Sequence, residues 1–218
     1  MNYPIITIAI ILLTTGFSLY CMNNPALKFK YIFHPYSIYH YKQHYRFLSH
    51  AFIHADYMHL LFNMYALWMF GDILERAALP VLFEGNLVKA KLFYLLLYTG
   101  AIYAASITEY FRYRRVESYT SLGASGAVNA VIFSSILMIP LGGIRMFLIP
   151  FDMPAWAFGI IFLGISYYLA KRQREGRGLG DNVGHEAHFW GAIFGFVLTG
   201  LMKPELFVEF FRSIFHWS

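Results

Sequence analysis

The stretch "SLGASGAVNA", residues 121–130, places a hydroxyl between small residues at the point where an apolar segment begins. No charged residue occurs from Ser118 to Ile144, and Ser125 stands near the start of that run. Small residues allow close helix packing inside membranes. A serine at this place could also act as a nucleophile. The rest of the chain must distinguish these two interpretations.

The composition indicates a membrane protein. Of the 218 residues, 58% are hydrophobic and only 13% are charged, whereas soluble domains carry roughly 25% charged residues. The length suits a single domain over residues 1–218. The formal net charge of +5 is scattered between apolar runs. This distribution suits contact with membrane lipids and does not indicate nucleic acid as a partner.

The N-terminal sequence "MNYPIITIAIILLTTGFSLYCM" lacks the basic region of a cleaved signal peptide and is long enough to span a bilayer. We therefore expect a retained first helix with no soluble N-terminal domain before it. Cys21 is the only cysteine, so no intrachain disulfide forms. We interpret it as a buried residue without a chemical role.

Charged residues limit six apolar runs, and a membrane span needs roughly 20 residues. All six should be helices, because the bilayer offers no water to backbone polar groups. The predicted spans are residues 4–22, 57–78, 92–108, 125–140, 153–170 and 187–202. Residues 23–56 are rich in Tyr, Phe and His, which predicts a structured segment at the membrane interface. The predicted fold class is an all-α polytopic membrane bundle.

Polar residues inside spans are costly and usually functional. His59 and Asn63 lie four residues apart near the start of the second span, just after His54. Ser125 opens the fourth span and His188 lies at the start of the sixth. These three spans run in the same direction through the membrane. The polar groups therefore lie on one side of the membrane and at similar depth.

Two ridges of small residues predict that the fourth and sixth spans pack closely. The ridges are Gly126, Ala130 and Ser134 on one helix, and Ala187, Gly191 and Gly195 on the other. Ser125 and His188 adjoin these ridges. Close packing would bring a serine hydroxyl to an imidazole, which is the pairing of a nucleophile with its base.

An oxyanion would find several donors at this place. The N-terminus of the fourth span supplies backbone N–H groups, and Asn63 and His59 add side-chain donors. One such donor is typically worth ~3 kcal/mol in the transition state. Glu186 is close to His188 in sequence but points to another helical face. A dyad of Ser125 and His188 is therefore the simpler hypothesis than a triad.

Each motif has a plainer interpretation when taken alone. "GASG" is more often a packing or turn motif, and His188 could be a hydrogen-bonding residue between helices. A metal site could use His50, His54 and His59, but their spacings of four and five are not completed by a carboxylate or Cys. We expect no metal and no organic cofactor.

Two other functions stay open from the residues. A transporter or channel would line a path with Ser, His and Asn, but it should show an internal repeat or polar residues through the full depth. The polar set is concentrated at one end, which favours a site. A catalytically inactive membrane-protein chaperone is the other alternative, and the intact Ser–His pair argues against it.

On these residues the chain resembles the rhomboid intramembrane serine proteases, and more closely their compact six-helix bacterial form. The resemblance covers nearly the whole chain. Its motifs are "GASG" at 123–126, "HxxxxHxxxN" at 54–63 and "AHxxGxxxG" at 187–195. Tyr45 and Arg46 look like a variant of the family's Trp-Arg pair. The order of these motifs, on the second, fourth and sixth spans, is specific.

The resemblance implies a serine endopeptidase that cleaves single-span transmembrane proteins within the bilayer. Ser125 would be the nucleophile and His188 the general base. Asn63, His59 and the Ser125 backbone N–H would stabilise the oxyanion. His54 would be a structural residue of its motif.

The resemblance also assigns glycines to support of the site. Gly123 and Gly126 would allow the tight backbone around the serine. Gly191 and Gly195 would allow the sixth span to approach the fourth. Many members of the family carry an aromatic residue four positions after the nucleophile, and here that position is Asn129.

The family topology implies a protein of the bacterial inner membrane, with a cytoplasmic N-terminus and a site toward the outer side. The fifth span and the loop before the sixth would gate and cap that site. The positive-inside rule favours the opposite orientation, because the predicted outer loops hold more of the 17 Lys and Arg residues. We expect the family topology, since several loops are short and partly embedded.

Overall fold

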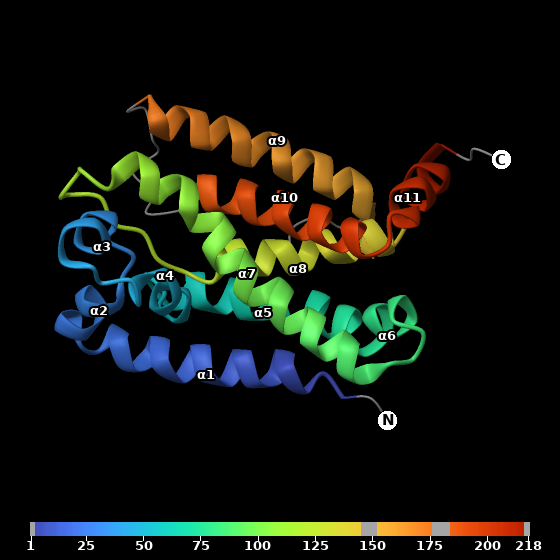
Figure 1. The fold of residues 1–218 in the computed structure, drawn as a ribbon, viewed down its shortest axis with the longest axis horizontal. Helices are drawn as coiled ribbons and strands as arrows, with labels where there is room; N and C mark the ends of the chain where they lie inside the picture. Colours follow the sequence, from blue (N-terminus) through green and yellow to red (C-terminus); the bar gives the residue numbers. More distant parts are fainter. Residues whose placement is uncertain (1–2, 145–151, 176–183, 216–218) are drawn as a thin grey trace.

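The computed structural model describes residues 3–144, 152–175 and 184–215. Helices make up most of this part of the chain, which confirms the predicted all-α fold. Figure 1 shows an elongated bundle whose long helices run roughly side by side, with α7 crossing the others diagonally. The long helices are α1 (Ile5–Met22), α5 (Tyr57–Ile73), α7 (Leu87–Tyr113), α8 (Ser125–Met138), α9 (Ala155–Arg174) and α10 (His185–Met202).

Short elements gather at the two ends of the bundle (Figure 1). The segment predicted at the membrane interface forms α2 (Pro25–Tyr31), α3 (Pro35–Tyr41), α4 (Arg46–Ser49) and the 3-10 turn η1 (His50–Phe52). The opposite end holds the π-helical turn η2 (Leu74–Ala78), α6 (Leu79–Leu82) and α11 (Glu205–Phe215). Two short strands, β1 (Gly143–Ile144) and β2 (Met153–Pro154), pair antiparallel. Helices α5, α8 and α10 all begin at the end that carries α2–α4.

Each predicted span overlaps a long helix, and the range 57–78 covers both α5 and η2. The helices differ in how well they suit a bilayer. By length and apolar composition, α1 and α7 qualify as spans, and α10 with α11 would make a third although the pair bends by 112°. At 14 residues α8 is short, and α9 ends in Lys171, Arg172 and Arg174. The count of six spans stays a prediction.

The sequence analysis did not anticipate α11. The chain breaks at Lys203, whose extended backbone (φ −148°) precedes Pro204. Proline disfavours the helical region for the residue before it but suits the first turn of a new helix. The chain therefore turns sharply and continues as a second helix.

Helix α8 forms the centre of the bundle. Its residues from Gly126 to Leu137 are all buried. Fourteen residues reach only about 21 Å, about two thirds of a hydrocarbon layer that is roughly 30 Å thick. In a bilayer, a helix this short would leave one of its ends below the membrane surface.

Helix α10 packs on α8 with its backbone in direct contact. A methyl group on Gly191 would run into the carbonyl oxygen of Gly126, and one on Gly195 would run into that of Ala130. The contacts advance by four residues on both helices, so two parallel rows of small residues match step for step.

Four residues further along both helices, the contact between α8 and α10 is polar. Ser134 Oγ lies 2.7 Å from Thr199 Oγ1, and both residues are completely buried. The two hydroxyls satisfy each other within the helix pair. The middle of the bundle therefore presents no open polar group at this step.

A buried carboxylate joins the other side of the bundle. Glu75 Oε1 accepts a hydrogen bond from the backbone N–H of Ile6 (2.9 Å), and Oε2 accepts from the N–H and hydroxyl of Thr7 (both 2.8 Å). The Tyr94 hydroxyl lies 2.8 Å from Thr7 Oγ1. Glu75 thus caps the unpaired first turn of α1 and, with Tyr94, ties it to η2 and α7.

We predict that Gly195→Ala destabilises the protein by about 3 kcal/mol, at the upper end for overpacking, because the new methyl meets backbone and not a movable side chain. Gly164→Ala on α9 is the matched control, since a methyl there meets no atom within 4 Å. Thermal unfolding in detergent measures both. Equal melting temperatures for the two variants would contradict the close contact.

Candidate active site

The loop before Ser125 is held by the interfacial segment. Phe33 and Ser121 exchange two backbone hydrogen bonds, of 3.0 and 3.1 Å. The Gly123 N–H donates to the His50 carbonyl oxygen at 3.1 Å. Strand-like and turn contacts of this kind fix the chain immediately before α8 begins.

His54 lies fully buried between α1 and this loop. Its backbone N–H donates to Ser18 Oγ (3.0 Å), and its ring Nδ1 lies 3.3 Å from the same oxygen. The Ala124 N–H points to Nε2 at 3.5 Å. We assign the proton to Nδ1, because Nε2 then accepts from the backbone. His54 thereby links α1 to the residue before Ser125.

His59 packs against the glycine that precedes the serine. A Cβ on Gly123 would lie 3.0 Å from His59 Cε1 and 3.8 Å from Ser125 Oγ, and Gly123 has φ +119°. Both its conformation and its surroundings therefore require glycine. The site thus brings the rim of the His59 ring close to the serine hydroxyl.

Two polar contacts fix the start of α5. The His59 N–H donates to Asp56 Oδ1 at 2.8 Å, which caps the helix and lowers the pKa of Asp56. Asn63 Nδ2 donates to the His59 carbonyl oxygen at 2.9 Å. An amide nitrogen carries two protons, so one N–H of Asn63 stays available for a ligand.

Ser125 and His188 occupy the first turns of adjacent helices. A Cβ on Gly126 would lie 3.3 Å from the Ala187 carbonyl oxygen, so the two turns are level. His188 Nε2 is buried and has no hydrogen-bond partner among the described residues, Ser125 included. The predicted hydrogen bond between the two side chains is thus not made in this structure. Catalytic hydrogen bonds are often long without substrate.

The ring neighbours of His188 come from residues that the sequence analysis did not single out. The Phe162 ring of α9 lies 6.2 Å from the His188 ring, tilted by 30°, and the His185 ring lies 5.9 Å away. Asn129 is buried within α8. An aromatic ring beside the imidazole is thus supplied by α9, whose range carries no motif from which it could have been predicted.

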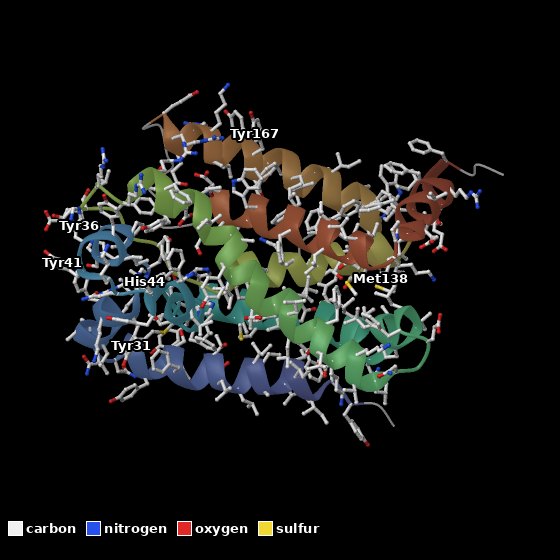
Figure 2. All side chains as sticks on the ribbon, viewed as in Figure 1. Tyr31, Tyr36, Tyr41, His44, Met138 and Tyr167 are labelled. Atoms are coloured by element: carbon white, nitrogen blue, oxygen red, sulfur yellow. The ribbon has the colours of Figure 1, made fainter. Side chains whose placement is uncertain are left out.

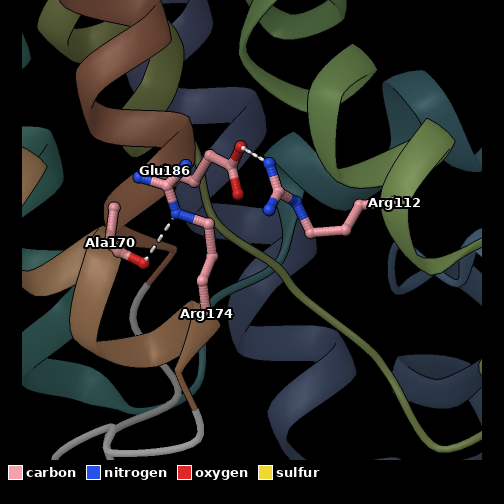
Figure 3. A network of polar contacts seen from close by, with 4 residues as sticks. All are labelled: Arg112, Ala170, Arg174 and Glu186. Carbon is pink, nitrogen blue, oxygen red and sulfur yellow. Dashed lines mark hydrogen bonds and ion pairs between the residues drawn. The ribbon is translucent and has the colours of Figure 1, made fainter.

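Glu186 forms an ion pair with an arginine of another helix. Arg112 Nη2 lies 3.1 Å from Glu186 Oε1, and Figure 3 shows this pair between α7 and α10. In the same view the Arg174 Nε donates to the Ala170 carbonyl oxygen of its own helix. The Glu186 carboxylate is therefore paired with Arg112, as suits the predicted dyad without a third member.

A second buried carboxylate lies beside the loop before Ser125. Glu109 Oε2 accepts a hydrogen bond from Ser121 Oγ at 2.8 Å, and the Tyr119 hydroxyl bonds to the same carboxyl. Burial, together with Glu109, raises the pKa of Tyr119, so the phenol keeps its proton. Glu109 Oε1 is buried without a partner among described residues and faces Gly184 at the start of α10. The sequence offered a signal for Glu109, because this acidic residue directly follows the apolar range 92–108.

The histidines considered as metal ligands in the sequence are His50, His54 and His59. Within residues 3–144, 152–175 and 184–215, no three His, Cys, Asp or Glu side chains converge as metal ligands. His50 instead packs its ring 5.1 Å from that of Phe33, and burial lowers the pKa of His50 to about 4. Residues 176–183, in the loop predicted to cap the site, lie outside the described residues.

Fold and site together define a polytopic α-helical membrane protein with a polar site enclosed by the N-terminal turns of three helices. The Rhomboid domain family matches residues 41–205. The chain therefore belongs to the rhomboid family.

Three relatives illustrate the similarity. RHOMBOID-like protein 12, mitochondrial, of Arabidopsis thaliana is 32% identical over 66% of this chain and 42% of its own length. Rhomboid protease GluP of Bacillus subtilis is 28% identical over 74% of this chain and 27% of its own. Rhomboid protease GlpG of Haemophilus influenzae is 28% identical over 74% of this chain and 73% of its own. The alignment spans less than half the length of the first two.

We predict that Glu109→Leu destabilises the protein by about 2 kcal/mol, because the Ser121 and Tyr119 hydroxyls would lose their buried acceptor. Glu109→Gln keeps an acceptor oxygen and should cost clearly less. Thermal unfolding of both variants decides the matter. Identical losses would show that the carboxyl fills space and does not hold the loop.

Proposed function

We propose that the protein is an intramembrane serine endopeptidase that uses Ser125 as the nucleophile and His188 as the general base. The observation that supports this most is the level packing of α8 and α10, which sets the first turn of one beside that of the other. The matched relatives named rhomboid proteases support the same reaction class.

The proposed reaction follows from the groups in these turns. Ser125 Oγ attacks the scissile carbonyl carbon while His188 Nε2 takes the hydroxyl proton, and the imidazolium then gives this proton to the leaving amine. Water afterwards hydrolyses the acyl-enzyme with His188 again as base. The unpaired Nε2 of His188 suits a role as acceptor.

The negative oxygen formed in this attack needs donors. The first N–H groups of α8, like those of any helix, have no partner within the helix. The cap residue Ala124 has no side-chain acceptor to bond them. The free amide proton of Asn63 and the ring of His59 complete the proposed oxyanion site. His54 and Gly123 act indirectly, by fixing the loop and the space around His59.

The substrate proposed is a single-span transmembrane protein. A recess at the N-terminal end of α8 would admit water from one side and a substrate segment from the lipid. Peptide carbonyls of an intact helix are already bonded, so a segment with small or helix-breaking residues would enter most readily. We place the protein in the bacterial inner membrane with this end outward and the N-terminus in the cytoplasm.

We predict that a fluorophosphonate labels the purified protein covalently at Ser125. Intact mass should show one adduct on the parent chain, none on Ser125→Ala, and at least tenfold slower labelling of His188→Ala, because the hydroxyl loses its base. Ser134→Ala removes another α8 hydroxyl and should still label. Absence of an adduct on the folded parent would favour an inactive chaperone or a transporter.

We predict that Phe162→Ala slows this labelling about tenfold, because the imidazole loses the ring that holds its orientation and small misplacements are costly to rate. Phe158→Ala is the matched control. Phe158 lies one turn earlier on α9 and contacts Phe162, with ring centroids 5.8 Å apart. Equal rates for the two variants would show that Phe162 does not orient His188.

A further inference from the structure

A groove outside the proposed active site opens between α1, the interfacial segment and α7. It has a volume of about 760 Å³. Its lining includes Leu13, Phe17, Tyr31, His44, Leu48 and Tyr103. We refer to it as the Tyr31 groove. Figure 2 shows Tyr31 and His44 at the end of the bundle that carries α2–α4.

The groove lies along the half of α1 that leads to the end carrying α2–α4, where Leu13 and Phe17 line it. From Leu13 to the end of α1 at Met22 are nine residues, about 14 Å along the helix. This part of α1 is about half as long as a hydrocarbon layer roughly 30 Å thick. The inner part of the groove is apolar, and its outer part ends among Tyr31, Tyr45 and His44. A lipid acyl chain fits this gradient from apolar wall to aromatic rim.

Ring contacts and hydrogen bonds hold the walls of the groove in place. The Phe17 and Tyr31 rings meet edge to face with centroids 5.3 Å apart. Ser49 Oγ donates to the Tyr31 carbonyl oxygen at 2.7 Å. The Tyr45 hydroxyl donates to the Lys30 carbonyl oxygen at 3.1 Å. These contacts hold the aromatic rim in place while leaving the space between them open.

The rim carries positive charge. The first acidic residue of the chain is Asp56, which interacts with Lys28, and no carboxylate lines the groove itself. Lys28 donates to the Ala55 carbonyl oxygen, and Arg46 donates to backbone carbonyl oxygens within the interfacial segment. Lys30 is exposed, lies 5.5 Å from the Tyr31 ring centroid, and has no ion-pair partner among the described residues.

We propose that the Tyr31 groove binds one anionic phospholipid, with an acyl chain between α1 and α7 and the phosphate beside Lys30 and His44. A headgroup that also carries an ammonium finds no carboxylate among the residues that line the groove. The charge pattern therefore favours phosphatidylglycerol-like lipids over zwitterionic ones.

Native mass spectrometry of the detergent-solubilised protein tests this directly. The protein is titrated with dioleoylphosphatidylglycerol or with dioleoylphosphatidylcholine, and the retained adducts are compared. We expect one phosphatidylglycerol to be retained at a concentration at least fivefold lower than phosphatidylcholine. Lys30→Gln should weaken phosphatidylglycerol binding about fivefold, the effect of one cation near a lipid surface, and leave phosphatidylcholine unchanged.

Two further variants complete the test. Leu13→Trp fills the groove from an exposed position and should weaken both lipids. Lys89→Gln removes an exposed charge from the start of α7, at the other end of the bundle, and should change neither. Equal retention of the two lipids, Lys30→Gln behaving like Lys89→Gln, or an unchanged Leu13→Trp would each overturn the proposal. None of these lipid-binding measurements depends on proteolytic activity.

Discussion

The contact of glycine on one helix with backbone on the other is the constraint on which the rest of the site depends. Gly191 and Gly195 leave no room for a Cβ against Gly126 and Ala130. Because both rows advance by four residues, the two helices are fixed in depth as well as in separation. A shift of one turn would break several contacts together. The proposed nucleophile and base are therefore positioned by backbone packing and not by a bond between their side chains.

The polar networks at the two ends serve different purposes. Glu75 joins the first turn of α1 to η2 and α7 at the end away from the site. At the other end, His54 and Glu109 hold the loop before Ser125 from two sides. Buried carboxylates are stable only when donors surround them. The unpaired oxygen of Glu109 departs from that rule, and it lies beside the start of α10.

Much of the architecture was predictable because apolar runs and small-residue spacing are strong signals. The ranges of the long helices and the matched ridges of 126–134 and 187–195 followed from them. The sharp turn at Lys203 was missed, since a proline after an apolar run also suits a simple span end. Phe162 and Arg112 were missed for another reason. Their contacts join helices distant in sequence, and no local spacing encodes them.

The distribution of polar groups with depth argues for a site and against a path. His59, Ser125 and His188 lie in the first turns of their helices and Asn63 in the second turn of α5, all at one end of the bundle. Further along α8 and α10, the facing hydroxyls of Ser134 and Thr199 are hydrogen-bonded to each other. A transport path would need polar groups free to exchange partners through the whole depth. Between α8 and α10 the hydroxyls of Ser134 and Thr199 are already engaged with each other, which argues against a transport path along this helix pair.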